Sequence, residues 1–344
     1  MKLRLFVAVT AAALTLTACS SSDGDKEPTT PDASKGTAKK LVEISPLTGR
    51  PLPNGRPDNP VFVVKIENTA NGAPQYGLNK ADMVVEELVE GGLTRLAALY
   101  YSNLPSKVGH VRSLRDTDIG IAAPVGGQVV ASGGAGGTYR RVERAGIKVF
   151  SEDGGAPGFS SDPAKSRPYN RMINLKTLAK KAKVNKIPGP YLPWTPTESA
   201  TKTPAASGTT PAPPRQKKTR KATVRFSNST STSWKLAGDT WQRTNGHAAP
   251  GKDFKANTMI VMFCKVGDAG YTDPAGNPVP ETKLEGKGRA LVFRGDTVTE
   301  VEWLKPSLEE SITFSTKAGE PYTIDPGRVF FELVPQGDGK VTLG

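Results

Sequence analysis

The N-terminal segment constrains this chain more than any other feature, because it determines where the chain folds and how the fold can be held together. Lys2 and Arg4 precede a short apolar run, and small residues lead up to Cys19. A basic start, an apolar stretch too short to span a bilayer and a small-residue cleavage site predict an export signal over residues 1–18. Cys264 is the only other cysteine. The fold must therefore form outside the cytoplasm with few or no disulfides.

The four residues Leu16 to Cys19 resemble the lipobox of bacterial lipoproteins, whose cysteine is acylated and becomes the new N-terminus. The resemblance implies a lipidated Cys19 and a protein held at the extracytoplasmic face of the cell membrane. If Cys19 carries lipid, Cys264 has no cysteine partner, so no intrachain disulfide forms. Cys264 ends the apolar run 259–264, which is typical of a buried strand, and we expect an inert thiol there.

The charge of the chain favours an anionic neighbour. The formal net charge is +13, and removing Lys2 and Arg4 with the signal leaves +11. We expect partners such as the membrane surface, reached through the lipid anchor, an anionic envelope polymer or a lipid-linked phosphate. Nucleic acid is the usual partner of so basic a chain, but the export signal argues against it.

The composition divides the chain into a tether, two folded domains and a linker. A length of 344 residues allows two domains. Residues 19–40 are rich in Ser, Asp, Pro, Thr and Lys and predict a flexible tether. Residues 195–222, Pro/Thr/Ala-rich and then basic, predict a disordered linker. The fold class is therefore α+β overall, with an α/β layered domain at 41–194 and a β-rich, sandwich- or barrel-like domain at 223–344.

Periodic segments support this division. Residues 61–66, 83–88 and 96–101 read as strands, and residues 139–145 and 174–183 as helices. In the second half, strands are expected at the ranges 223–226, 233–236, 239–243, 290–293 and 298–303. Gly238-Asp239 and Gly295-Asp296 lie between neighbouring strands, as tight hairpin turns require.

Arginines and glycine loops of the first half predict an anion-binding site. The candidate residues are Arg95, Arg112, Arg115, Arg171, Gly133 and Gly134. Glycines between a strand and a helix let backbone N–H groups approach an anion, and arginine adds two-pronged donors for phosphate or carboxylate. The alternatives are that the glycines only make turns and that the arginines form salt bridges with Glu86, Glu87 or Asp116.

Carboxylates of the same half suggest a metal site as an alternative. Asp82 and Asp116 are the candidate ligands for magnesium, which needs one or two carboxylates plus ligand oxygens. No other cofactor is indicated. The two histidines, His110 and His247, lack zinc-ligand spacing, and no serine elbow is present, so zinc and serine-hydrolase chemistry are not expected.

Ordered sequence blocks resemble the YerB-type lipoprotein family. These are Pro46-Leu-Thr-Gly49, Tyr76 to Glu86, Val89 to Arg95, Lys107 to Ser113, Gly288 to Asp296, Trp303 and Pro326 to Pro335. The chain departs from the family pattern at Gly109-His110 and at Leu114-Arg-Asp116, and by its basic linker. The resemblance implies a two-domain exported lipoprotein. It implies no activity, because the function of the family is not established.

The order of Asp82, Arg115-Asp116 and Gly133-Gly134 is also similar to that in LytR–CpsA–Psr cell-wall ligases, although Ala81 stands where those enzymes have serine. That likeness implies binding of polyprenyl-pyrophosphate through arginines and magnesium.

Three hypotheses follow from the sequence: an envelope protein that binds an anionic ligand or partner, a magnesium-dependent phosphotransferase acting on polyprenyl-pyrophosphate-linked glycan, and a scaffolding lipoprotein without a small-molecule site. Whether the chain is an enzyme stays open. The first two require the arginines, with Asp82 or Asp116, to surround one concave pocket.

Overall fold

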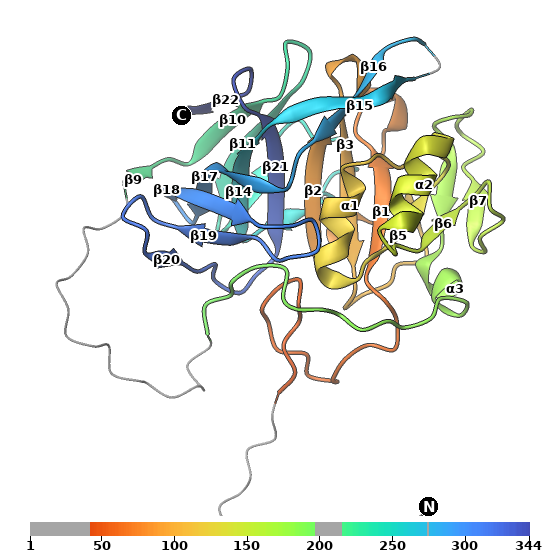
Figure 1. Ribbon diagram of the computed structural model, residues 1–344, viewed down its shortest axis with the longest axis horizontal. Coiled ribbons are helices and arrows are strands. Elements are labelled where there is room, and N and C mark those ends of the chain that lie inside the picture. The colour runs from red at the N-terminus through yellow and green to blue at the C-terminus, as the bar shows by residue number, and fades with distance from the viewer. Residues whose placement is uncertain (1–41, 197–214, 274) are drawn as a thin grey trace, which may run out of the picture. The chain divides into compact units, whose positions relative to one another are not determined.

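The computed structural model describes residues 42–196, 215–273 and 275–344, which form a mainly β structure (Figure 1). Within these residues, no helix has the length and apolar character needed to cross a membrane. Cys19, the expected signal and the expected tether lie outside the described residues.

The first half contains short strands and three short helices. They are β1 (Phe62–Glu67), β2 (Met83–Leu88), β3 (Thr94–Tyr100), β4 (Val108–Gly109), α1 (Asp118–Ala122), β5 (Gln128–Ala131), α2 (Gly136–Arg144), β6 (Val149–Ser151), β7 (Phe159–Ser161), β8 (Arg171–Ile173) and α3 (Leu175–Ala179). The predicted strands and both predicted helices are present. The helix expected at 174–183 is only α3, whose first turn is capped by the Asn174 side chain accepting from Thr177 N at 3.1 Å.

The second half consists of strands. They are β9 (Gln216–Lys218), β10 (Lys221–Arg225), β11 (Ser231–Ala237), β12 (Thr240–Arg243), β13 (Lys255–Ala256), β14 (Thr258–Cys264), β15 (Val266–Thr272), β16 (Pro278–Thr282), β17 (Gly286–Arg294), β18 (Thr297–Lys305), β19 (Thr313–Ser315), β20 (Pro321–Tyr322), β21 (Val329–Pro335) and β22 (Lys340–Leu343). The two predicted hairpins, β11–β12 and β17–β18, are confirmed, and Gly238 and Gly295 adopt the positive φ that their turns need.

One large sheet joins the two halves. Its strand order is β20-β19-β18-β17-β14-β21-β2-β3-β1-β5-β6, with β9 added beside β18. The joint is the parallel pairing of β2 with β21, from Met83 opposite Val329 to Glu87 opposite Leu333. The segments 41–194 and 223–344 therefore contribute strands to one sheet.

Each face of this sheet is covered by its own core. On one face, Ile121 of α1 and Val142 of α2 pack with Val63 and with Phe331 of the second half. Figure 1 shows these two helices in front of β1 and β5. On the other face, the five-stranded sheet β13-β12-β11-β10-β22 contributes Trp234 to the second core. Alternating side chains of β1 enter opposite cores, as a strand buried on both faces requires.

A buried carboxyl pair lies at the joint. Glu86 of β2 and Glu332 of β21 are register partners, and both are fully buried. The Trp234 indole donates to Glu332 Oε1 at 2.6 Å, and the Thr232 hydroxyl donates to Glu86 Oε1 at 3.1 Å. Burial, with the neighbouring charge of Glu86, raises the pKa of Glu332 well above its usual value. Glu332 Oε2 has no hydrogen-bond partner among the described residues.

Two sequence expectations need correction. The first half is richer in strand than an α/β layer, because its helices have only five, nine and five residues and most crossings between strands are loops and short turns. The linker expected at 195–222 is shorter, because residues 215–222 include β9 and the start of β10, while residues 197–214 lie outside the described residues.

Candidate functional site

A cavity of about 560 Å³ lies where the loop before α2, the loop before β8 and the β15–β16 hairpin meet. We call it the α2 cavity. Its lining consists of Glu90, Ser113, Arg115, Ser132, Gly133, Gly134, Ala135, Glu152, Asp153, Arg167, Pro168, Arg171, Tyr271, Thr272 and Asp273. Four of the six residues predicted to bind an anion, Arg115, Arg171, Gly133 and Gly134, therefore share one cavity.

The glycine loop is fixed against the arginine-bearing segment before α1. Leu114 N donates to Gly133 O at 2.9 Å, and Ser132 N donates to Arg112 O at 3.0 Å. At Gly134, a β-carbon would lie 2.2 Å from Leu114 Cδ2, so the close approach of the two segments requires glycine there. The helix that follows has Ala135 as its N-cap and no side-chain cap. Its first N–H groups therefore have no protein acceptor from a cap.

Arg115 forms one wall of the cavity and pairs with Glu90. Its Nη2 lies 2.6 Å from Glu90 Oε1, and its Nη1 donates to Leu114 O at 2.8 Å. Burial alone would raise the pKa of Glu90, but the hydrogen bond and charge of Arg115 outweigh burial and lower the pKa. Glu90 is therefore a carboxylate, and the pair is ionic.

A second glutamate in the lining, Glu152, pairs with the other two arginines. Arg171 Nε donates to Glu152 Oε2 at 2.5 Å, and Arg167 Nη2 donates to Glu152 Oε1 at 2.9 Å. Arg171 is largely buried, whereas the side chain of Arg167 is 66% exposed. Reorienting Arg167 toward a ligand therefore requires less free energy than reorienting Arg171.

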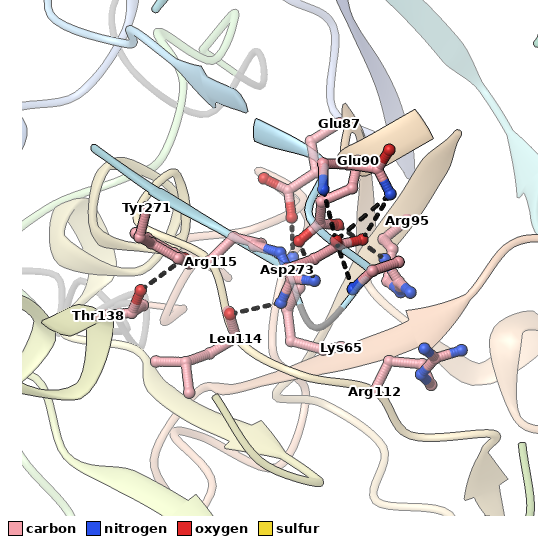
Figure 2. A network of polar contacts seen from close by, with 12 residues as sticks. Lys65, Glu87, Glu90, Arg95, Arg112, Leu114, Arg115, Thr138, Tyr271 and Asp273 are labelled. Atoms are coloured by element: carbon pink, nitrogen blue, oxygen red, sulfur yellow. Dashed lines mark hydrogen bonds and ion pairs between the residues drawn. The ribbon is translucent and has the colours of Figure 1, made fainter. Parts of the chain in front are cut away.

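The second half of the chain closes the cavity through the β15–β16 hairpin. Tyr271 OH and Thr138 Oγ1 of α2 are 2.7 Å apart, so the hairpin is hydrogen-bonded to the helix (Figure 2). This contribution could not be predicted from the sequence, because Tyr271 is 100 or more residues from the arginines and lies in an ordinary strand.

Arg95 and Arg112, also predicted to bind an anion, do not line the cavity. Both pair with Glu67, and Arg95 Nη2 is 3.6 Å from Glu67 Oε2. Burial lowers the pKa of Arg95 to about 10, the Glu67 carboxylate opposes this shift, and the charges of Arg112 and Arg115 add to it. These two arginines therefore form salt bridges, but with Glu67 and not with the expected partners Glu86, Glu87 or Asp116.

A fully buried ionic group lies beside Arg115. Lys65 contacts Glu87 and Asp118, with 2.6 Å between Lys65 Nζ and Asp118 Oδ1. Asp118 Oδ2 also accepts from Arg115 N at 2.7 Å, so this group fixes the backbone at the cavity wall. Burial opposes the charge of Lys65, but Asp118 and Glu87 outweigh burial and raise its pKa.

The expected magnesium pair, Asp82 and Asp116, is not assembled. Asp82 directly precedes β2 and accepts from Tyr101 N and Ser102 N at 2.7 and 3.0 Å, so it holds the end of β3. Asp116 pairs with Arg141, and its neighbour Arg115 reaches Glu90 beyond the other end of β2. A six-residue strand spans about 20 Å, so the two carboxylates cannot share an ion. Among the described residues, no group of three or more His, Cys, Asp or Glu side chains is placed to hold a metal.

Cys264, the one cysteine within the described residues, is buried and unpaired. Burial raises the pKa of its thiol, as expected for an inert core residue.

Comparison with known proteins assigns the chain to a protein family. The model of "Protein of unknown function (DUF3048) N-terminal domain" matches residues 47–188, and the model of the corresponding C-terminal domain matches residues 222–331. The chain belongs to the DUF3048 family. The resemblance to YerB-type lipoproteins is thereby confirmed, since the curated "Putative lipoprotein YerB" of Bacillus subtilis (strain 168) is 36% identical over 112 residues.

That match covers 33% of this chain and 33% of YerB, so it spans about a third of the curated relative's length. A crystal structure of YerB protein from Bacillus subtilis covers 87% of this chain and 99% of that chain, with a TM-score of 0.68 and 20% identity. The structural likeness shows that this DUF3048 chain shares the YerB fold.

Proposed function

We propose that this protein is a lipid-anchored envelope protein on the extracytoplasmic face of the cell membrane, and that it binds an anionic ligand in the α2 cavity. The lipobox-like sequence ending in Cys19 and the printed name of the Bacillus relative, a putative lipoprotein, support the anchor. The net charge supports an anionic neighbour.

One observation carries the binding proposal. Arg115, Arg171, Gly133 and Gly134, which lie far apart in the sequence, line the same cavity, and Arg167 joins them. The α2 cavity is in the usual size range of small-molecule sites. Uncapped N–H groups at the start of α2 and nearby guanidinium groups are the donors that a phosphate or carboxylate uses.

Another cavity of about 540 Å³ is lined by prolines, Tyr101, Trp194 and Arg56 and contains none of the predicted anion-binding residues. Its walls offer one guanidinium and no glycine loop before a helix, so the α2 cavity is the better candidate for an anion.

The binding test is a calorimetric titration of the full-length protein with inorganic phosphate and pyrophosphate. Arg167→Ala is expected to weaken binding at least tenfold, because Arg167 lines the cavity and is exposed enough to be removed without disturbing the core. Arg56→Ala is the matched control, since Arg56 is 64% exposed and forms a comparable 2.9 Å bond to Glu43. Equal loss in both variants, or no binding of either anion by the parent protein, would contradict the proposal.

The anchor is tested separately. Cys19→Ser is expected to abolish incorporation of labelled palmitate and to move the protein from the membrane fraction to the medium or periplasm. A variant that stays in the membrane fraction would show that something other than lipid on Cys19 holds the protein there.

The phosphotransferase and scaffolding hypotheses remain as alternatives to the proposed anion binding. The phosphotransferase hypothesis loses its two-carboxylate magnesium site, because Asp82 accepts from the end of β3 and Asp116 pairs with Arg141. The scaffolding hypothesis becomes the preferred explanation if the titration shows no ligand.

A further inference from the structure

The charges lining the α2 cavity point to a particular class of ligand. Three arginines, Arg115, Arg167 and Arg171, face four carboxylates. The carboxylates are Glu90, Glu152, Asp153 and Asp273. A simple anion therefore enters a cavity whose formal lining charge is slightly negative, and it competes with Glu90 and Glu152 for the arginines.

Asp153 adds a further negative charge beside the glycine loop. Its Oδ2 lies 2.8 Å from the position that a β-carbon on Gly133 would take, so the carboxylate lies against the loop. Across residues 42–196, 215–273 and 275–344, the Asp153 side chain has no hydrogen-bond or ion-pair partner, and it is exposed. An anion bound at the loop therefore lies near a second negative charge, unless the ligand brings a donor to Asp153.

Hydroxyl groups complete the lining. Ser113 and Ser132 line the cavity, and their side chains form no hydrogen bond within the described part of the chain. Tyr271 also lines the cavity, and its hydroxyl is hydrogen-bonded to Thr138. Carboxylate acceptors and small hydroxyls beside an anion subsite suit a ligand with several hydroxyl groups.

We propose that the ligand is a phosphorylated sugar or polyol, with its phosphate at the Gly133-Gly134 loop and Arg167 and with its hydroxyls on Asp153 and Ser132. This proposal rests on the proposed function and specifies its ligand. The same chemistry occurs in free sugar phosphates, in polyol-phosphate polymers and in lipid-linked glycosyl phosphates.

The test compares four probes by calorimetry on the full-length protein: methyl phosphate, glucose 1-phosphate, glycerol 1-phosphate and glucose. Glucose 1-phosphate or glycerol 1-phosphate is expected to bind at least tenfold more tightly than methyl phosphate, and glucose alone is expected not to bind. The better of the two phosphates distinguishes a sugar from a polyol source.

Variants then separate the two parts of the site. Asp153→Asn and Ser132→Ala are each expected to reduce the advantage of the hydroxyl-bearing phosphate over methyl phosphate at least threefold. Asp153→Asn removes a negative charge, so it is expected to leave methyl phosphate binding equal or stronger. Asp239→Asn, in the exposed β11–β12 turn, is the control and is expected to change neither affinity.

The outcomes distinguish this inference from the proposed function. Equal affinities for methyl phosphate and both hydroxyl-bearing phosphates would overturn the sugar or polyol inference and leave the anion site intact. An unchanged ratio in both Asp153→Asn and Ser132→Ala would also overturn the inference. Failure of every phosphate to bind would overturn the proposed function as well.

Discussion

Replacing Glu332 by glutamine tests how the two halves of the sheet are joined. Glu332 faces Glu86 in the buried β2–β21 pairing, and burial with the charge of Glu86 raises its pKa well above the ordinary value. Glutamine keeps the oxygen that accepts from Trp234 and supplies an N–H group in place of the carboxyl proton. The substitution therefore preserves the contacts and removes only the titration.

The size of the effect follows from proton linkage. A carboxyl whose folded pKa is raised binds more protons in the folded than in the unfolded chain, so its contribution to stability is complete below the unfolded pKa and is lost as pH rises. Between the unfolded pKa and the folded pKa, the loss is about 1.4 kcal/mol per pH unit for one proton. Over that interval, Glu332→Gln is therefore expected to gain about 1.4 kcal/mol per pH unit relative to the parent protein.

The assay is urea unfolding followed by tryptophan fluorescence at pH 5, 6 and 7, with Glu302→Gln, on the exposed face of β18, as the control. The difference in unfolding free energy between Glu332→Gln and the parent is expected to widen with pH, while that of the control stays constant. Parallel pH profiles for all three proteins would refute the raised pKa of Glu332 as the cause of pH-dependent stability at the joint.

Three further predictions concern single sites. Gly134→Ala should destabilise the protein by about 1–3 kcal/mol in thermal unfolding, because the new β-carbon would meet Leu114, whereas an unchanged midpoint would show that the loop can move away. Burial lowers the pKa of Lys305 to about 8, so the free energy of unfolding should increase as pH rises from about 8 to 10.5. Lys305→Met should remove roughly 3 kcal/mol of this increase in urea unfolding across that pH range. An increase that persists in the variant would show that other groups cause it. Cys264 should resist iodoacetamide in the folded protein and react only on unfolding, so rapid labelling under native conditions would contradict its burial.

Local patterns were sufficient to predict most strands. The apolar run of β2 and the hairpin turns at Gly238 and Gly295 each depend on neighbouring residues, so they can be recognised in sequence. The glycine loop before α2 was recognised for the same reason.

Features that depend on distant segments could not be predicted in this way. The pairing of β2 with β21, the carboxyl pair that it buries and the contribution of Tyr271 to the α2 cavity each join the two halves of the chain. For Asp82, the sequence led to a role that the structure does not support. An acidic residue before a strand was interpreted as a metal ligand, but its oxygens accept hydrogen bonds from the end of β3. Residue type alone does not distinguish these roles.

The β2–β21 pairing also has a consequence for how the chain acquires its structure. During synthesis or passage across a membrane from the N-terminus, β2 can pair with β3, but its other edge stays open until β21, near the end of the chain, has emerged. Contacts between such distant segments form slowly, and an open apolar edge is prone to pairing with other chains. A nascent or truncated chain that lacks β21 should therefore be an aggregation-prone species and a natural client of chaperones.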